Sequence, residues 1–235
     1  MIREALEKFL YVLFPRRCDL CGDVVEFDKS RCDECTNSVR ILGEICDRCG
    51  HTKSDCKCKK NADKMEYKSV CAPFYFDGNI VKAVHRFKFY GFNELSVGMG
   101  KEIALTVKER YNDVSFDLVT YVPMTNKRQK KRGYNQSLLL ARSVSEEMNI
   151  PCVKCLVKIR DTDSQRSQSA KNRKLNVFGA YDIANDVDFT DKTILIVDDV
   201  KTTGNTLNEC AKMLKGYKAK AVYAASFAIA KQNVN

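Results

Sequence analysis

Residues 194–206, which read ILIVDDVKTTGNT, decide the fold of this chain. Thr193–Val197 is a short, apolar, β-branched run and predicts a buried strand that ends at Asp198 and Asp199. The following residues lead into a helix expected over 204–215 and supply hydroxyl groups, an amide and a flexible backbone: Thr202, Thr203, Gly204, Asn205 and Thr206. Because N–H groups and hydroxyls at a helix start bind anions, the stretch predicts a phosphate site beside two carboxylates.

The chemistry of this stretch suits a sugar phosphate. Gly204 lets the backbone approach a phosphate closely, and two adjacent carboxylates can accept hydrogen bonds from a vicinal diol or lie near a metal. The chain lacks G-x-x-x-x-G-K-[ST] and has no G-x-G-x-x-G after a strand, which argues against a P-loop or a dinucleotide fold. An ordinary strand-to-helix turn capped by Asp and Thr remains the alternative.

Strand and helix signals alternate through the larger part of the chain. Strands are expected over 117–122, 152–157, 177–183, 193–197 and 221–228, and helices over 79–90, 93–111, 134–149 and 204–215. This alternation predicts an α/β domain with a mainly parallel sheet covered on both faces, and ligands beyond the carboxyl ends of its strands. The polar residues 59–68 are expected to form a linker.

Two basic segments and several aromatic residues are further candidates for binding. The segment NKRQKKR (126–132) holds five cations in seven residues and could clamp a pyrophosphate; a solvated loop is the alternative. Residues 158–174 carry a net charge of +4 and fit either a mobile lid or a plain surface loop. Single-stranded nucleic acid could stack on aromatic residues that otherwise belong to the core: Phe87, Phe89, Tyr90, Phe92 and Tyr134.

Eight of the 12 cysteines fall between residues 18 and 58, in closely spaced pairs. They form two candidate sets of zinc ligands, Cys18, Cys21, Cys32 and Cys35, then Cys46, Cys49, Cys56 and Cys58. Four thiolates suit a closed, structural zinc site, so two Zn²⁺ ions are expected. A cross-braced pairing uses the same ligands and remains open, and His51 could replace one thiolate. Cys152 and Cys155 have no companion pair and are interpreted as strand residues.

Composition limits the setting in which the protein works. No apolar run of about 18 residues and no secretory leader is found, so we expect no membrane span and a reducing cytoplasm that keeps the cysteines available for metal. The formal charge of +10 falls to +6 if two zinc–tetrathiolate sites each contribute −2, which still attracts phosphates. Residues 1–17 predict an amphipathic helix that packs on the protein, or alternatively docks on a membrane or a partner.

Four segments resemble known families. ILIVDDVKTTGNT is similar to the ribose-phosphate signature of type I phosphoribosyltransferases. YVPMTNKRQKKRGYNQSLLLA (121–141), a motif from Arg160 through Thr162, Gln165 and Arg173 to Asn176, and the cysteine pairs resemble the ComF family, which is linked to natural competence. One departure from that family is Ser169, where Leu is expected.

The resemblance implies a fold, a ligand and a set of roles. It implies a type I phosphoribosyltransferase-like domain over 61–235, a double zinc ribbon over 18–60, and binding of 5-phosphoribosyl-1-pyrophosphate with Mg²⁺. Asp198 and Asp199 would bind the ribose hydroxyls, and Thr202–Thr206 would hold the 5-phosphate. The basic loop would bind the pyrophosphate through Arg128, Arg132, Asn135 and Gln136. A flexible loop would supply Arg160, Gln165 and Arg173. Lys201 receives no role.

Two functions remain open at this stage. The first is a phosphoribosyltransferase acting in DNA uptake, whose acceptor no motif identifies. The second is a non-catalytic protein that binds single-stranded DNA together with DNA-uptake proteins and keeps the pocket as a nucleotide or sensor site. A fold by itself does not decide between them.

Overall fold

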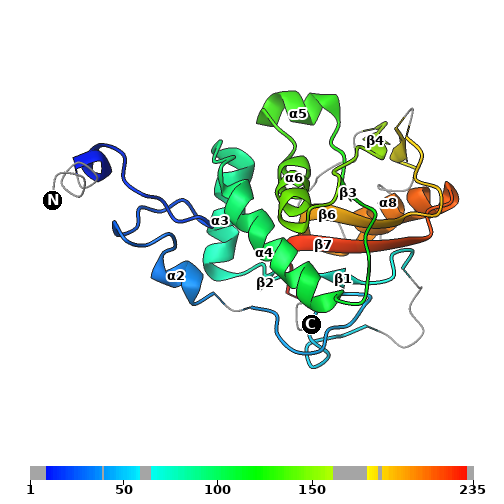
Figure 1. Ribbon diagram of the computed structural model, residues 1–235, viewed down its shortest axis with the longest axis horizontal. Helices are drawn as coiled ribbons and strands as arrows, with labels where there is room; N and C mark the ends of the chain where they lie inside the picture. Colours follow the sequence, from blue (N-terminus) through cyan, green and yellow to red (C-terminus); the bar gives the residue numbers. More distant parts are fainter. Residues whose placement is uncertain (1–8, 39, 59–64, 161–178, 185–186, 232–235) are drawn as a thin grey trace.

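The computed structural model describes residues 9–38, 40–58, 65–160, 179–184 and 187–231. Its central sheet is parallel throughout and has the order β1-β7-β6-β3, with β2 also paired to β7 (Figure 1). The strands are β1 (Val70–Cys71), β2 (Phe74–Tyr75), β3 (Leu118–Tyr121), β6 (Thr193–Lys201) and β7 (Ala221–Ile229). The predicted α/β fold with a mainly parallel sheet is confirmed.

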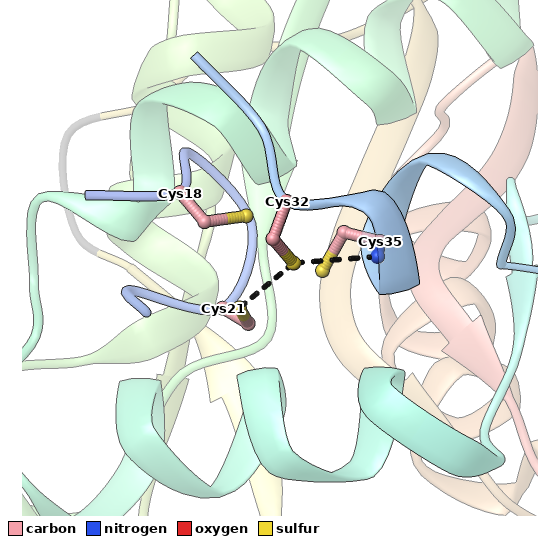
Figure 2. A group of neighbouring side chains, drawn as sticks. All are labelled: Cys18, Cys21, Cys32 and Cys35. Atoms are coloured by element: carbon pink, nitrogen blue, oxygen red, sulfur yellow. Dashed lines mark hydrogen bonds between the residues drawn. The ribbon is translucent and has the colours of Figure 1, made fainter. Parts of the chain in front are cut away.

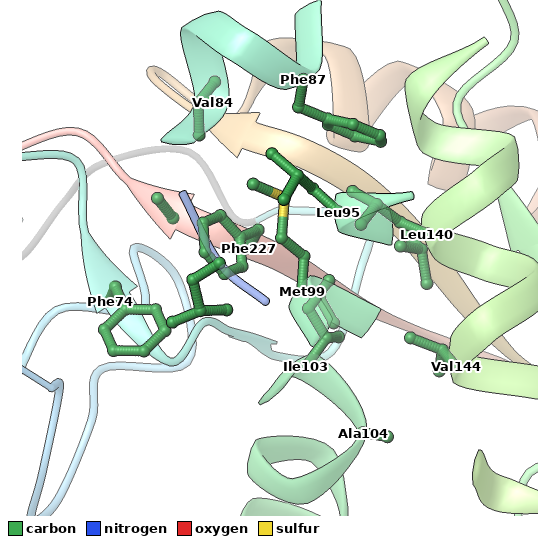
Figure 3. Close-up of a cluster of buried hydrophobic side chains, with 14 of the residues drawn as sticks. Phe74, Val84, Phe87, Leu95, Met99, Ile103, Ala104, Leu140, Val144 and Phe227 are labelled. Atoms are coloured by element: carbon green, nitrogen blue, oxygen red, sulfur yellow. The ribbon is translucent and has the colours of Figure 1, made fainter. Parts of the chain in front are cut away.

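Helices cover both faces of this sheet. The first face carries α3 (Gly78–Phe89), α4 (Leu95–Arg110) and α6 (Gln136–Met148), and the second carries α8 (Asn205–Gly216). Side chains of β6 alternate between the two cores: Leu195 and Val197 join the first, and Ile194 and Ile196 join the second. Figure 3 shows the first core, where Phe74, Met99, Leu140 and Phe227 meet.

β6 does not end at the acidic pair, so that part of the prediction is wrong. The strand continues to Lys201 because β7 is long enough to supply backbone partners: Asp198 pairs with Ser226, and Lys201 with Ile229. On its other side β6 loses its neighbour at Val197, where β3 ends at Tyr121. The acidic pair therefore lies beyond the carboxyl end of β3 but within the β6–β7 ladder.

A two-stranded antiparallel sheet, β4 (Leu156–Lys158) with β5 (Tyr181–Ile183), lies apart from the main sheet. The strand expected over 152–157 begins later, because Cys152 makes only one bridge, to Val119 of β3. The backbone N–H of Cys155 then donates to the Thr120 hydroxyl at 3.3 Å, which turns the chain away from the sheet edge.

The basic segment 126–132 is a helix, α5 (Asn126–Arg132), and not the loop that its charge suggested. The hydroxyl of Thr125 caps its start by accepting from the N–H of Arg128. Gly133 ends it at φ 84°, a backbone angle that suits glycine. The five cationic side chains of this segment therefore lie on a short helix, and none of them is buried.

The cysteine-rich module is continuous with the α/β domain. Cys18, Leu20, Cys21 and Cys35 belong to the same hydrophobic core as α3 and α4. The buried carboxylate Glu102 of α4 accepts hydrogen bonds from Arg31 at 2.7 Å and Arg40 at 2.5 Å. Burial by itself would raise the pKa of Glu102, but these two hydrogen bonds outweigh it and the pKa is lowered.

Two expectations for the N-terminal half differ from the structure. Tyr67, in the expected linker, is buried, while residues 59–64 lie outside the described residues. The short helix at 9–13 exposes most of its apolar side chains, namely Phe9, Leu10, Val12 and Leu13, and Phe14 after it is also exposed. Tyr11 contacts the ring of Phe27 and donates to the carbonyl of Val25 at 2.5 Å. Residues 1–8 lie outside the described residues, so packing on the protein and docking on a partner or a membrane both stay predictions.

Among the helices of the described residues, none has both the length and the apolar character needed to cross a bilayer.

The contact between α4 and the zinc module predicts a severe effect of Gly98→Ala. A methyl group on Gly98 would lie 2.2 Å from the carbonyl oxygen of Asp19, so the two segments would have to separate. We expect a loss of about 2–4 kcal/mol in the free energy of unfolding, measured with urea. Gly216→Ala is the control, since a methyl group there meets nothing within 4 Å. Equal stability of the two variants would contradict this packing.

Candidate phosphoribosyl site and zinc centres

Asp198 and Asp199 are consecutive residues of β6, beyond the end of β3. The Asp198 carboxylate accepts a hydrogen bond from the Ser137 hydroxyl, at the start of α6, at 2.8 Å. A pair of carboxylates therefore lies at the sheet edge where β3 has stopped.

Burial dominates the electrostatics of Asp198. Desolvation, followed by the charge of Asp199, raises the pKa of Asp198 to about 7, although the hydrogen bond from Ser137 and the charge of Lys88 oppose this rise. An acid with a pKa near neutrality is easily ionised or protonated by whatever binds beside it. This kind of perturbation is typical of functional sites, and it also occurs in purely structural ion pairs.

Lys88 of α3 forms an ion pair with Asp199 at 2.8 Å. Both side chains are largely buried, at 19% and 14% exposure, so little solvent screens their attraction. No sequence pattern selects Lys88, because it stands in a helix among aromatic residues and far from the acidic motif. In the folded protein, Lys88 is nevertheless in contact with the Asp199 carboxylate.

The predicted phosphate loop connects β6 to α8. Gly204 is the N-cap of α8 at φ 83°, which a residue with a side chain rarely adopts. Thr202 is exposed, and the Thr203 hydroxyl accepts from the N–H of Asn205 at 3.4 Å. The N–H groups of the first turn of α8 thus lie at the end of a loop that is shaped to receive an anion.

The R-G-Y-N-Q segment lies at the start of α6. Asn135 is buried and caps α6, accepting from the N–H of Ser137 at 3.0 Å and donating to the carbonyl of Val122 at 3.2 Å. Gln136 is fully buried and accepts from Arg132 at 3.1 Å, whereas its Nε2 atom has no hydrogen-bond acceptor. Of the two, Asn135 has an evident structural role, and Gln136 presents an unsatisfied donor.

Arg128 and Thr206 lie near the same group, Tyr181 of β5. Burial raises the pKa of Tyr181, the charge of Asp198 adds to the rise, and the Thr206 hydroxyl and the charge of Arg128 oppose it. The structure therefore gathers the start of α8, α5 and β5 around Asp198. Arg160 is exposed at the end of the described segment, and Gln165 and Arg173 lie outside the described residues.

The eight clustered cysteines form two groups of four, Cys18, Cys21, Cys32 and Cys35, and Cys46, Cys49, Cys56 and Cys58. The ligand atoms within each group lie within 4.8 Å of one another. Figure 2 shows the first group, in which the Cys21 and Cys32 sulfurs are 3.7 Å apart; the Cys49 and Cys56 sulfurs are 3.6 Å apart. Zn–S bonds of about 2.3 Å in a tetrahedron require sulfurs about 3.8 Å apart, so both groups fit structural Zn²⁺.

The grouping is sequential and not cross-braced. His51 belongs to neither group, because its Nε2 atom lies 3.1 Å from the carbonyl oxygen of Ala230. The Cys35 sulfur also accepts a hydrogen bond from the Asn79 side chain of α3 at 2.9 Å, which joins the first zinc site to the α/β domain. Within the described residues, Cys152 and Cys155 join no such group.

Comparison with known proteins agrees with this arrangement. A family model described as a phosphoribosyl transferase domain matches residues 135–233, and one described as a double zinc ribbon domain matches residues 9–73. Competence protein F of Haemophilus influenzae is 34% identical over 137 residues, which cover 56% of this chain and 60% of that protein. Competence protein ComFC of Bacillus subtilis is 28% identical over 156 residues, covering 66% and 61% respectively. The chain thus spans about three fifths of the length of these relatives.

A DNA utilization protein, YhgH, of Escherichia coli is 29% identical over 143 residues, covering 59% of this chain and 62% of that protein. Among solved structures, glutamine phosphoribosylpyrophosphate amidotransferase of Bacillus subtilis superimposes with a TM-score of 0.41 at 20% identity, covering 61% of this chain and 30% of that one.

Fold and site together define a type I phosphoribosyltransferase-like domain joined to a double zinc ribbon. The chain is similar in sequence to the competence proteins F of Haemophilus influenzae and ComFC of Bacillus subtilis.

The raised pKa of Asp198 predicts a stability that falls with pH. Its pKa is about 7 in the folded protein against 3.8 in the unfolded chain, so the folded state binds more protons between these values and is destabilised as the pH rises through them. Relative to Asp198→Asn, the wild type should lose about 1–3 kcal/mol between pH 5 and pH 8 in urea unfolding. Glu109→Gln, at an exposed carboxylate of α4, should leave the slope unchanged. Parallel pH profiles for wild type and Asp198→Asn would refute the assignment.

Zinc stoichiometry in paired variants tests the sequential grouping. Cys18→Ser with Cys35→Ser damages one site in the observed grouping and should retain one zinc per chain, measured by elemental analysis. Cys18→Ser with Cys46→Ser damages both sites and should retain none. A cross-braced module would give the opposite pair of results, because Cys18 would then share a site with Cys46.

Proposed function

We propose that this protein binds 5-phosphoribosyl-1-pyrophosphate with Mg²⁺ at the β6–α8 junction and acts in the cytoplasm during DNA uptake. The observation that carries the proposal is the acidic pair Asp198 and Asp199, placed where β3 has ended and directly before the loop that starts α8. The two family matches and the names of the relatives support the setting in natural competence.

Each group at the junction has a task in this binding mode. Asp198 and Asp199 accept hydrogen bonds from the two ribose hydroxyls, and the turn from Thr202 to Thr206 holds the 5-phosphate with N–H groups and the dipole of α8. Arg128 and Arg132, on α5, face the anionic side of the ligand.

Magnesium fits this site through the ligand and not as a permanent resident. Hard oxygen donors suit Mg²⁺, which keeps several waters and is bound by one or two carboxylates together with substrate phosphates. When bound, Mg²⁺ would supply positive charge for the pyrophosphate. The carboxylates already contact Ser137 and Lys88, so a ligand has to rearrange the Lys88–Asp199 pair before it engages both acids.

Transfer of the phosphoribosyl group is the reaction that such a site supports. The bond between the anomeric carbon and pyrophosphate breaks, the pyrophosphate leaves with the bonding electrons, and an acceptor forms the new bond to that carbon. The basic groups of α5 would stabilise the departing negative charge.

The binding proposal predicts discrimination by the ribose hydroxyls. Calorimetric titration should show that phosphoribosyl pyrophosphate binds with Mg²⁺, and that ribose 5-phosphate binds more tightly than 2-deoxyribose 5-phosphate. The variant Asp198→Asn with Asp199→Asn should weaken binding of the first ligand about 10-fold or more and abolish the preference for ribose.

Glu146→Gln with Glu147→Gln is the matched control, because it also neutralises two adjacent carboxylates, here exposed on α6. It should leave all three affinities unchanged. No heat with phosphoribosyl pyrophosphate at millimolar concentration, or an undiminished preference for ribose in the Asn variant, would end the proposal.

A second candidate function, binding of single-stranded DNA, is favoured by the outer face of α3. A cavity of about 710 Å³ lies there, lined in part by Lys82, His85, Arg86 and Tyr90. Phe89 and Tyr90 are 53% and 71% exposed, whereas Phe87 is buried in the core and is excluded as a stacking residue. Exposed rings beside cations are what unpaired bases stack on. Asp23 pairs with Lys82 and Arg86 and lowers the net charge of this face.

Tyr90→Ala tests the second candidate. Fluorescence anisotropy with a labelled thymidine oligonucleotide should show about a 5- to 30-fold loss of affinity in this variant, and wild-type affinity should fall steeply with salt. Tyr217→Ala, at another exposed tyrosine, is the control. Equal binding by the two variants would remove α3 from consideration.

A further inference from the structure

The second zinc group lies directly against the end of the sheet that carries the phosphate loop. Gly50 follows the ligand Cys49, and a methyl group on Gly50 would lie 2.9 Å from the carbonyl oxygen of Val70 and 2.5 Å from a side-chain carbon of Ile229. Ile229 is the register partner of Lys201, the last residue of β6. The turn formed by Cys46–Gly50 and the end of β6 are therefore separated only by one β7 residue.

Backbone hydrogen bonds run from this zinc turn to Lys201. The buried ring of His51 lies with Nε2 3.1 Å from the carbonyl oxygen of Ala230, and the N–H of Ala230 donates to the carbonyl of Lys201 at 2.8 Å. On the other side, the N–H of Val70 donates to the carbonyl of Asp47 at 3.1 Å. The ladder that positions Lys201 thus extends into the zinc module.

Tyr67 makes a second connection, through its side chain. Its hydroxyl donates to the carbonyl of Arg48, between two zinc ligands, at 2.8 Å. A methyl group on Gly204 would lie 3.0 Å from that same hydroxyl and 3.1 Å from the side chain of Lys201. One hydroxyl group therefore contacts the zinc turn and lies against the N-cap of α8 in the phosphate loop.

Lys201 places a positive charge between the two sites. The side chain is only 4% exposed, and burial lowers its pKa, while the charges of Cys49, Cys58 and Cys46 act to raise it. A zinc ion with four thiolates has a net charge of −2, which stabilises a nearby buried ammonium.

We propose that the zinc site formed by Cys46, Cys49, Cys56 and Cys58 holds the phosphate loop in its binding shape through Lys201 and Tyr67, so that zinc at this site and a phosphate ligand at the loop stabilise each other. The ligand half of this statement rests on the proposed function. By thermodynamic linkage, if zinc at the second site strengthens ligand binding, ligand binding must strengthen zinc retention by the same factor. Lys201 is thus a positioning residue, which acts on the ligand through the loop.

The test compares Lys201→Met and Tyr67→Phe with Lys101→Met, which removes a charge from an exposed position of α4. The holoprotein is incubated with a zinc chelator and N-ethylmaleimide, and peptide mass spectrometry follows alkylation of the two cysteine groups separately. In Lys201→Met and Tyr67→Phe the second group should be alkylated about 10-fold faster, a change of the size seen when groups that support a metal site from outside its ligands are lost. The first group should keep its wild-type rate.

Hydrogen exchange supplies the second measurement. The amides of 202–206 should exchange faster in Lys201→Met and Tyr67→Phe than in Lys101→Met, without any added ligand. Equal acceleration of both cysteine groups would show general destabilisation and overturn the proposal. So would second-group and loop rates that match those of Lys101→Met.

Addition of phosphoribosyl pyrophosphate with Mg²⁺ to the wild type separates this proposal from the proposed function. Slower alkylation of the second group alone is the result expected from linkage, and the effect should shrink in Lys201→Met. Calorimetric binding without any such protection would overturn the linkage and leave the proposed function intact. If the wild type binds no ligand, the proposed function fails, and the alkylation and exchange rates of the variants still decide whether zinc positions the loop.

Discussion

The parallel pairing of β6 with β7 is the constraint on which the site depends. It continues from Thr193 to Lys201, past the point where β3 has ended. Beyond Val197 the backbone of β6 still pairs with β7 on one side and no longer pairs with β3 on the other. These residues are therefore held in place, while one edge of their backbone is not used by β3. A loop that begins from a fixed strand end loses less conformational freedom when it binds a ligand than a loop that begins from a free one.

The acidic pair on this ladder is unequal, because its two carboxylates have different partners. Asp199 meets the ammonium of Lys88, whereas Asp198 meets the hydroxyl of Ser137 and a buried surround that raises its pKa to about 7. Two identical residues that are adjacent in sequence therefore have different surroundings, because different helices supply their partners.

Much of the fold and both zinc groups could be predicted, because their signals are local. Alternating apolar runs give the strands, and C-x2-C spacing gives the ligands. The end of β6 could not be predicted, since it depends on partners that β7 supplies. Lys88 and Tyr181 were missed for a related reason: each comes from an element whose sequence shows no functional pattern. The helix α5 was taken for a loop because its charge was more conspicuous than its capping residue Thr125.

The burial of Lys201 could not be predicted from the sequence. A lysine in a phosphate loop is expected to face phosphate or solvent, and in this chain it is buried beside cysteines more than 140 positions away in sequence. A buried ammonium is costly unless a negative charge lies close, and a zinc–tetrathiolate is one of the few structural groups that carry a net charge of −2. In the proposed coupling, the thiolates of the second zinc group supply the negative charge that stabilises a lysine as the last residue of β6. An apolar core of the same size could fill that space, but it would supply no such charge.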